Sequence, residues 1–355
     1  MYIRKKIAVP VILLLMIISE TAMAAIHIPP SIPARAAILL DITADDAAAA
    51  PEKLSSREMK RRKRELEKQR RREEREQRRR TKGSTTAVRL DSRKAAGEQG
   101  GIDPTVFFPP LPEAKVLYER NADVNMAPAS LTKMLTALVA VKESNYRKLK
   151  LNRPINVRRD EAEETDYLVA GEILPLSEAL AQMLIISDNG AAYAVARQIG
   201  SDGQGRDGQA GFYRRMNEYA GAMKLTGSYF ADASGLPAPG HVSTARDLSI
   251  IARYLLKDKD LKPIVGMKTR NITCIYPKRH RVFAENTNDL VYDYPGCYGI
   301  KTGYTNAAGF CLAAAAERDG HRLLTVVLGG DEEEDRFTAA TRLFDFGFKL
   351  LGNKD

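Results

Sequence analysis

The order of the patterned segments after residue 103 constrains the fold most strongly. Helical periodicity fills the middle of this part, strand-like alternation fills its later half, and one amphipathic helix closes it. Helices that precede a run of strands predict an α+β domain, with helices packed on an antiparallel sheet. The expected helices begin at Ser130 and cover 176–199, 211–223, 244–256 and 336–351, and the expected strands cover 271–276, 281–285, 299–302, 309–317 and 322–328.

The first 24 residues have the composition of a secretory signal peptide. A start that contains Arg4, Lys5 and Lys6 is followed by a short apolar run and then by Ala22-Met23-Ala24. A basic start, an apolar core and a small-x-small site are typical of a signal that is cleaved after export. We therefore expect the body of the protein in the periplasm or on the outer face of the cytoplasmic membrane. An uncleaved N-terminal anchor is the alternative.

Residues 25–102 are expected to lie outside the catalytic domain, which we place at 103–355. Residues 25–51 are rich in Ala and Pro and predict a flexible spacer, and residues 81–101 predict a linker. Residues 52–82 hold 16 Lys and Arg against 7 Glu, which is +9 of the chain's net charge of +10. Their Glu and Arg residues four apart predict a solvated charged helix. This segment is interpreted either as a spacer or as a patch for anionic membrane or envelope polymers, and the export signal argues against nucleic acid.

Cysteine and histidine do not form a recognisable site in the sequence. The three cysteines, Cys274, Cys297 and Cys311, are too few for a disulfide framework, and whether Cys297 pairs with Cys311 stays open. The four histidines are scattered and show no metal-ligand spacing. We expect neither a metal nor another cofactor.

The first of three short motifs is Ser130-Leu131-Thr132-Lys133. The apolar stripe that follows predicts a helix, so Ser130 lies near its N-terminus and Lys133 lies one turn further on the same face. A serine hydroxyl needs a base to become a nucleophile, and a buried lysine with a lowered pKa can be that base. Ser130 alone is equally well interpreted as a helix cap.

The second and third motifs supply polar groups around such a nucleophile. In Ser187-Asp188-Asn189, Ser187 can relay a proton, and Asn189 can hold Lys133 and a substrate amide. Lys301-Thr302-Gly303 lies on a predicted strand, whose backbone can bind an extended substrate. There Lys301 supplies positive charge, Thr302 offers a hydroxyl to a substrate carboxylate, and Gly303 leaves room for close approach.

Together and in this order, the three motifs are the signature of penicillin-binding proteins and class A β-lactamases. Longer segments resemble the low-molecular-mass penicillin-binding proteins, the D-alanyl-D-alanine carboxypeptidase family, over roughly residues 103–351. These segments are MAPASLTKMLTA (126–137), GLP (235–237), GHVSTARDL (240–248), GIKTGYT (299–305) and AGFCL (308–312).

The resemblance implies a β-lactamase/transpeptidase-like fold, in which an antiparallel sheet is packed between helical layers. It implies that Ser130 is acylated by peptidoglycan stem peptides and by β-lactam antibiotics, with Lys133 as base. The backbone N–H groups of Ser130 and Tyr304 would form the oxyanion hole. Arg336 matches, by its place before the last helix, an arginine that helps to bind the substrate's terminal carboxylate.

Three alternatives to a carboxypeptidase remain. Only residues 352–355 follow the last predicted helix, so the family's usual second domain is not expected, which resembles the D,D-endopeptidase branch. A class A β-lactamase needs a Glu with Asn four residues later, but Glu218 and Glu285 are followed at that spacing by Ala222 and Asp289. A non-catalytic scaffold on the same fold is the third alternative.

Overall fold

The computed structural model describes residues 29–47, 104–201, 208–277 and 280–352. The predicted signal peptide and the basic segment 52–82 lie outside the described residues. No helix within the described ranges is both long enough and apolar enough to cross a membrane.

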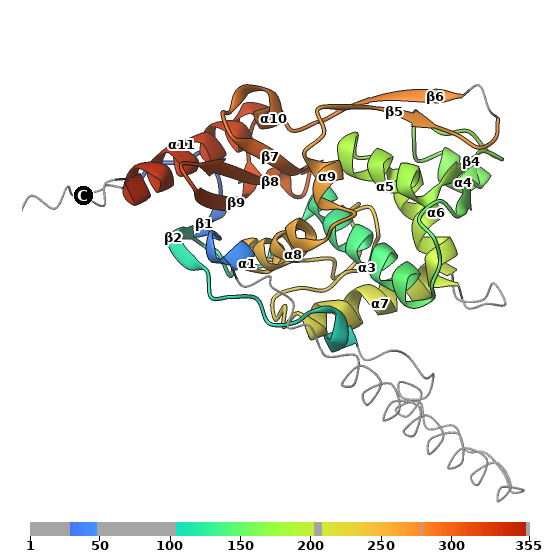
Figure 1. Ribbon diagram of the computed structural model, residues 1–355, viewed down its shortest axis with the longest axis horizontal. Coiled ribbons are helices and arrows are strands. Elements are labelled where there is room, and N and C mark those ends of the chain that lie inside the picture. The colour runs from blue at the N-terminus through green and yellow to red at the C-terminus, as the bar shows by residue number, and fades with distance from the viewer. Residues whose placement is uncertain (1–28, 48–103, 202–207, 278–279, 353–355) are drawn as a thin grey trace, which may run out of the picture.

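A five-stranded sheet forms one half of the molecule (Figure 1). All neighbouring pairs are antiparallel, and the spatial order is β2-β1-β9-β8-β7. Its strands are β1 (Ala36–Asp41), β2 (Lys115–Arg120), β7 (Cys297–Thr305), β8 (Gly309–Arg318) and β9 (His321–Gly330). The three late strands were predicted. Because β7 is last in this order, one of its edges is not paired within the sheet.

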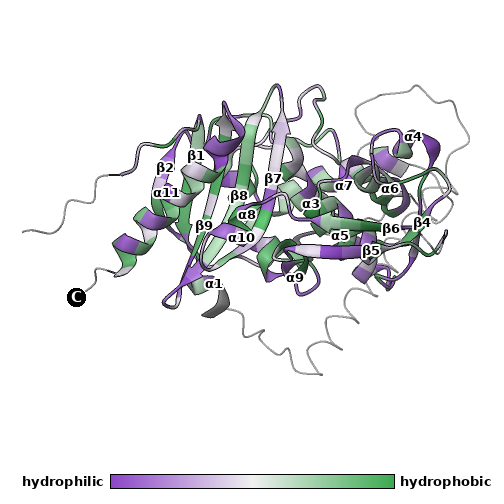
Figure 2. Cartoon of the chain, turned by 90° about the horizontal axis from the view of Figure 1, so that it is seen from above, coloured by the Kyte–Doolittle hydropathy of each residue, from purple (hydrophilic) through white to green (hydrophobic). Residues whose placement is uncertain are grey.

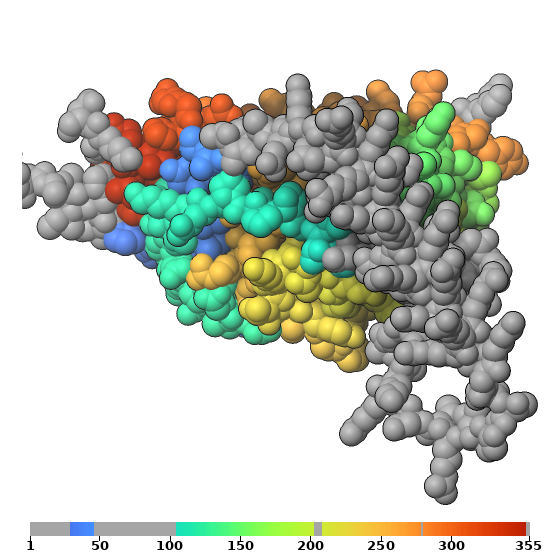
Figure 3. All heavy atoms as spheres, turned by 60° about the horizontal axis from the view of Figure 1, so that its bottom comes forward, coloured from blue at the N-terminus to red at the C-terminus, as the bar shows by residue number. Residues whose placement is uncertain are grey.

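The prediction of a flexible spacer is wrong for residues 36–41, because they form β1, an inner strand of the sheet. Ala36 pairs with Leu328 of β9, and Asp41 pairs with Lys115 of β2. In Figure 3 the blue surface of this segment lies beside the turquoise surface that includes β2. The strand was missed because both of its faces are covered, so it is apolar throughout and shows no alternation. The domain therefore begins before residue 103, and the basic segment belongs to the connection between two neighbouring strands.

Helices cover both faces of the sheet, as the predicted fold class requires. On one face, Ala37 and Leu39 pack with Phe344 of the last helix, α11 (Glu333–Gly352). On the other face, Ile38 and Leu40 belong to the larger core, which also includes the inner faces of α3 (Thr132–Tyr146) and α8 (Ala245–Lys257). Figure 2 shows apolar residues along the central strands β8 and β9, between these helices.

The other half of the molecule is helical. The predicted stretch 176–199 is two helices, because Ser187-Asp188 breaks it and Asp188 caps the second one by accepting from Ala191 N. The longer helices here are α5 (Leu176–Ile185), α6 (Asn189–Gly200) and α7 (Gly208–Ala222). Short helical turns are α1 (Ala44–Ala47), η2 (Pro104–Phe107), η3 (Ala129–Leu131), α4 (Arg159–Ala162), α9 (Lys262–Val265) and α10 (Leu290–Asp293).

Two small antiparallel hairpins complete the fold. The first pairs β3 (Pro154–Asn156) with β4 (Ile173–Pro175), and the second pairs β5 (Thr269–Thr273) with β6 (Arg281–Glu285). Figure 1 shows the second hairpin along the helical half, apart from the main sheet. An ion pair between Arg270 and Glu178 ties it to α5. After the first hairpin the chain continues into α5, which ends just before the second motif. After the second hairpin it continues through α10 into β7, on which the third motif lies.

Candidate active site

Ser130 lies in the short turn η3, immediately before α3. The residue before it, Ala129, has φ of +47°. A non-glycine residue in this region is uncommon, and such strain is often found at functional turns. Ser130 is half-buried, and its Oγ lies 2.8 Å from Lys133 Nζ, one helical turn further on. The local fold thus sets hydroxyl and amine side by side.

Lys133 is fully buried and has three hydrogen-bond acceptors. Its Nζ donates to Ser130 Oγ, to Asn189 Oδ1 at 2.8 Å and to the carbonyl oxygen of Ser234 at 2.7 Å. Burial lowers its pKa to about 7, although the negative charges of Asp188 and Asp232 act in the opposite direction. A large fraction of this amine is therefore neutral near neutral pH.

The second motif lies between α5 and α6, and its residues point to different neighbours. Ser187, with φ of +66°, lines the same cleft as Ser130, and Asn189 begins α6 and contacts Lys133. Asp188 is buried and holds the motif in place by accepting from Gln182 Nε2 at 2.8 Å and from Thr165.

The third motif lies on the edge strand β7. Lys301 is buried, and its Nζ donates to the carbonyl oxygen of Thr302 at 2.9 Å. Its pKa is held well below the usual lysine range, first by burial and then by the positive charges of Lys133 and Arg336. Thr302 Oγ1 lies 2.6 Å from Thr287 Oγ1, while Tyr304 is exposed and stacks on Phe310.

Two glycines allow the nucleophile's turn to fit between β7 and a loop. A Cβ on Gly303 would lie 3.0 Å from the Ser130 backbone nitrogen, and a Cβ on Gly235 would lie 1.9 Å from the carbonyl oxygen of Ala129. Gly235 also has φ of +93°. Glycine at position 303 is therefore favoured by the close approach of the Ser130 turn, and not only by the approach of a ligand.

Arg336 is buried at the start of α11. It forms an ion pair with Glu333, and its guanidinium lies 5.4 Å from the centre of the Phe310 ring. Its Nε is buried and has no hydrogen-bond partner within the described residues. Burial lowers its pKa from the usual arginine value, while Glu333 and Asp289 raise it.

A cleft of about 480 Å³ joins these groups. Seven of the nine predicted site residues line it, and Lys133 and Lys301 are buried behind its wall. The seven are Ser130, Ser187, Asn189, Thr302, Gly303, Tyr304 and Arg336. A hollow of about 630 Å³, lined by Lys262, Met267 and Tyr298 among others, contains none of the predicted residues.

Sequence reasoning missed several groups of the cleft. Thr287, Asp289 and Leu236 line it, and none of them lies in a motif. Asp232 holds the loop that supplies the Ser234 carbonyl: its Oδ1 accepts from the backbone nitrogens of Ser234 and Gly235, both at 2.7 Å. The only sequence signal for this loop is the segment 235–237, which was noted as a resemblance but not assigned to the site.

His241, from the segment 240–248, stands behind the nucleophile's helix. Its Nδ1 accepts from the backbone nitrogen of Ala231 at 3.0 Å, and its Nε2 lies 2.9 Å from Thr132 Oγ1. Because Nδ1 is an acceptor, the neutral Nε2–H form fits this arrangement, and burial lowers the pKa of His241 in agreement with it. The imidazole therefore fastens the loop 231–241 to the start of α3.

The arrangement has the parts required for acyl transfer through a serine. A hydroxyl lies beside a buried amine, backbone N–H groups lie at a helix start and on an edge strand, and a buried guanidinium lies at the far wall. Such a cleft can hold an extended peptide that ends in a carboxylate.

Comparison with known proteins agrees with this geometry. Residues 112–332, more than half of the chain, match the family model described as D-alanyl-D-alanine carboxypeptidase. The D-alanyl-D-alanine carboxypeptidase DacF of Bacillus subtilis is 32% identical over 66% of this chain and 59% of its own length. DacC of Escherichia coli is 31% identical over 67% of this chain and 59% of its length. This chain thus spans 59% of each of these two curated relatives.

Solved structures show the same fold. The Streptomyces K15 DD-transpeptidase matches with a TM-score of 0.62 and 27% identity, over 66% of this chain and 92% of that chain. A penicillin-binding protein homologue from Mycobacterium tuberculosis matches with a TM-score of 0.64 over 92% of this chain, and at 23% identity it supports the fold alone. The chain therefore belongs to the D-alanyl-D-alanine carboxypeptidase family, the low-molecular-mass penicillin-binding proteins.

Proposed function

We propose that this protein is a serine-type D-alanyl-D-alanine carboxypeptidase that acts on peptidoglycan stem peptides. The observation that carries the proposal is the pair Ser130 and Lys133, 2.8 Å apart, with a lysine pKa of about 7. Arg336, which lines the cleft, provides a cation for the terminal carboxylate of the peptide. The family membership supports the same activity.

In the first half-reaction, neutral Lys133 takes the proton of Ser130, and Oγ attacks the carbonyl carbon of the penultimate D-alanine. The backbone N–H groups of Ser130 and Tyr304 stabilise the oxyanion. Collapse of this intermediate breaks the C–N bond. The leaving D-alanine takes the proton from Lys133, through Ser187 as relay, and an acyl-enzyme on Ser130 remains.

In the second half-reaction, water gives a proton to Lys133 and attacks the ester carbonyl. The bond between the carbonyl carbon and Oγ then breaks, Lys133 returns the proton to Oγ of Ser130, and the shortened peptide leaves with a new carboxylate. A penicillin reacts by the first half-reaction alone: the opened ring keeps its amine leaving group attached to the acyl group. We therefore expect β-lactams to acylate Ser130. Asn189 holds Lys133 in place through the 2.8 Å hydrogen bond.

The test is chromatography of digested cell-wall fragments after incubation with the protein. We expect pentapeptide fragments to lose one D-alanine, with Ser130→Ala as the inactive control. If cross-linked dimers become monomers instead, the D,D-endopeptidase is the correct function. If new cross-links appear, the protein is a transpeptidase, as the name of the Streptomyces K15 DD-transpeptidase says of that enzyme. Fragments that are unchanged, or that are changed equally by Ser130→Ala, would contradict the assignment of the nucleophile.

The proposal also includes a role for the N-terminal residues. Residues 1–24 direct export, which brings the enzyme to its substrate outside the cytoplasm, and the mature chain begins near Ala25. N-terminal sequencing of the protein from the cell envelope tests this cleavage, and an intact Met1 would contradict it.

For residues 52–82 we keep the two interpretations, spacer or polyanion-binding patch, and one experiment separates them. A patch binds vesicles that contain anionic lipids, and salt weakens this binding, whereas a spacer does not bind even at low salt. A chain that lacks 52–100 keeps β1 and β2 and should cleave soluble peptides at nearly the native rate. A chain that also lacks 29–51 loses an inner strand of the sheet and should not fold.

A further inference from the structure

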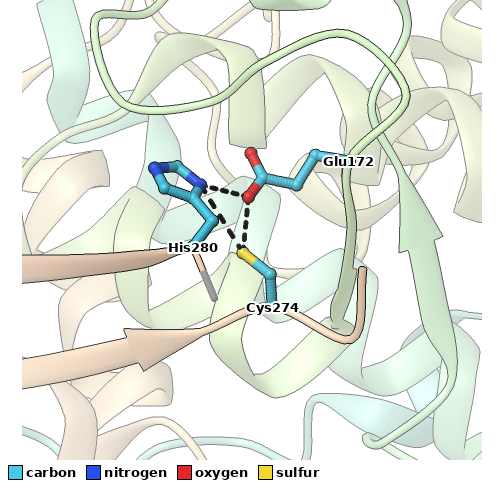
Figure 4. Close-up of side chains that lie close together, drawn as sticks. All are labelled: Glu172, Cys274 and His280. Atoms are coloured by element: carbon cyan, nitrogen blue, oxygen red, sulfur yellow. Dashed lines mark hydrogen bonds and ion pairs between the residues drawn. The ribbon is translucent and has the colours of Figure 1, made fainter. Parts of the chain in front are cut away.

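Three side chains with different metal-binding atoms meet at the end of the β5–β6 hairpin, away from the catalytic motifs. Cys274 directly follows β5, His280 directly precedes β6, and Glu172 precedes β4. Figure 4 shows their carboxylate, thiol and imidazole groups pointing toward one another. The fold thus brings together residues that lie about a hundred positions apart in the chain.

The three donor atoms of this cluster all lie within 4.8 Å of one another. Cys274 Sγ lies 2.7 Å from Glu172 Oε1 and 4.0 Å from His280 Nδ1, and His280 Nδ1 also contacts Glu172 Oε1. On tetrahedral zinc, nitrogen and sulfur ligands are about 3.5 Å apart, given bond lengths of about 2.0 and 2.3 Å. The two contacts of Glu172 Oε1 are shorter than this spacing, so the carboxylate oxygen has to move away from the sulfur and the imidazole for an ion to enter between the three groups.

The carboxylate of Glu172 is the buried oxygen donor of this cluster. Glu172 is fully buried, and no lysine or arginine among the described residues forms an ion pair with it. Its Oε2 accepts from the backbone nitrogen of Val169 at 3.0 Å, which orients the carboxylate and leaves Oε1 facing the sulfur and the imidazole. A buried carboxylate is stable when it is paired or coordinates a metal.

A second chemical interpretation, a cysteine nucleophile assisted by histidine, fits less well. A reactive cysteine requires a positive environment that lowers its pKa. Burial and the neighbouring Glu172 instead raise the pKa of Cys274 to about 12. The thiol is also buried, so a substrate has little access to it. A thiol that is hard to ionise alone becomes a thiolate when a dication binds beside it, because the ion stabilises the negative charge.

We propose that Glu172, Cys274 and His280 bind a zinc ion that fastens the β5–β6 hairpin to the segment before β4. One sulfur, one nitrogen and one oxygen ligand suit zinc better than magnesium or calcium, which take oxygen ligands. Binding replaces the thiol proton, which passes to the solvent. The His280 side chain is 33% exposed, so water can reach the ion and complete four-fold coordination.

The place of the cluster gives the ion a structural role. The hairpin is held to the helical half by backbone bonds between Ile173 and Ile275–Tyr276 and by the Arg270–Glu178 ion pair. Zinc would add a third tie at its far end. From the same hairpin the chain continues to Thr287, which contacts Thr302 in the cleft. Since the ion binds only the folded form, it should raise Tm.

The experiment uses the purified full chain. After purification without chelator, metal analysis should find about one zinc per chain, and chelation should lower Tm by about 5 °C or more, with recovery on adding Zn²⁺. Co²⁺ in place of zinc should give the near-ultraviolet absorption of a cobalt–thiolate bond. Penicillin labelling before and after chelation shows whether the domain stays folded.

Matched variants locate the ion. Cys274→Ser should remove the cobalt–thiolate absorption and weaken zinc binding at least 10-fold, whereas Cys297→Ser, which leaves the same number of thiols, should change neither. His280→Asn should weaken binding, and His321→Asn is its control. Absence of zinc together with no thiolate absorption on adding Co²⁺ to the native chain would overturn the proposal, and so would equal absorption in Cys274→Ser. The zinc content and the cobalt–thiolate absorption of the native chain do not depend on how well the variants fold.

Discussion

Lys133 on α3 and Lys301 on β7 are the same residue type, equally buried on two walls of one cleft, yet their surroundings differ. Lys133 has three acceptors, one of them the Ser130 hydroxyl, and the carboxylates of Asp188 and Asp232 are near enough to raise its pKa. For Lys301 the structure gives one acceptor, the Thr302 carbonyl, and the nearby charges of Lys133 and Arg336 are positive.

This difference shows how one residue type can serve two purposes. The two carboxylates partly offset burial at Lys133, so its pKa falls to about 7 rather than lower, and the amine can both accept and return a proton near neutral pH. Lys301 has no hydroxyl partner among the described residues and lies beside other cations. Its hydrogen bond to the Thr302 carbonyl supports the strand that would hold the substrate carboxylate.

The largest effect should come from Lys133→Arg. Arginine keeps the positive charge but cannot accept a proton at working pH, so the general base is lost. Loss of a general base typically costs about 10²–10⁴-fold. The rate of labelling by fluorescent penicillin measures acylation, and circular dichroism checks the fold. Labelling near the native rate would show that Lys133 is not the base.

Gly303→Ala should have the next largest effect. The added Cβ would lie 3.0 Å from Ser130 N, so the turn that carries the nucleophile must give by a few tenths of an ångström. A displacement of about 1 Å at a reacting group can cost about 10²-fold in rate, so we expect a loss between about 10-fold and about 10²-fold. Gly221→Ala on α7 is the matched control, because its Cβ would meet nothing within 4 Å. Equal labelling rates for the two variants would mean that β7 does not position the Ser130 turn.

Lys301→Arg should be milder and sharpens the comparison directly. Both lysine-to-arginine changes add similar bulk in fully buried positions, but Lys301 transfers no proton in the proposed mechanism. We expect a loss of about tenfold in acylation rate, equivalent to about 1.4 kcal/mol of transition-state free energy. If this variant is as slow as Lys133→Arg, bulk rather than proton transfer explains both losses.

The smallest effect is the pH dependence of the native enzyme. With a Lys133 pKa of about 7, the neutral fraction of the amine falls as pH falls. Between pH 7 and pH 6 the acylation rate should drop about fivefold, and above pH 8 it should level off. Lys301→Arg should keep the same midpoint. A rate that does not change from pH 6 to pH 8 would contradict a titrating base in this range.

Much of the fold followed from the sequence where one face of an element is exposed. The helices near 211–223 and 244–256 agree with the structure within a few residues, because amphipathic periodicity marks them. The strands near 309–317 and 322–328 also agree, although they are buried on both faces, because turn residues around Asp319-Gly320 separate two apolar runs of strand length. β1 is equally buried but lies in an Ala- and Pro-rich stretch, and only pairing with β2 and β9 distinguishes it from an apolar spacer. Because β1 and β2 lie far apart in the sequence, no local pattern indicates that they pair.

The sequence by itself determined the family and the residues expected to carry the chemistry, because side-chain type and short spacing along one helix or strand set what Ser130, Lys133, Asn189 and Lys301 can do. The tertiary structure decided the environment that those residues have. Burial sets the Lys133 pKa, Asp232 and Gly235 shape the loop against the nucleophile, and Glu172 meets Cys274 and His280 across the fold. Desolvation and long-range contacts depend on how distant segments pack, and no local pattern records them.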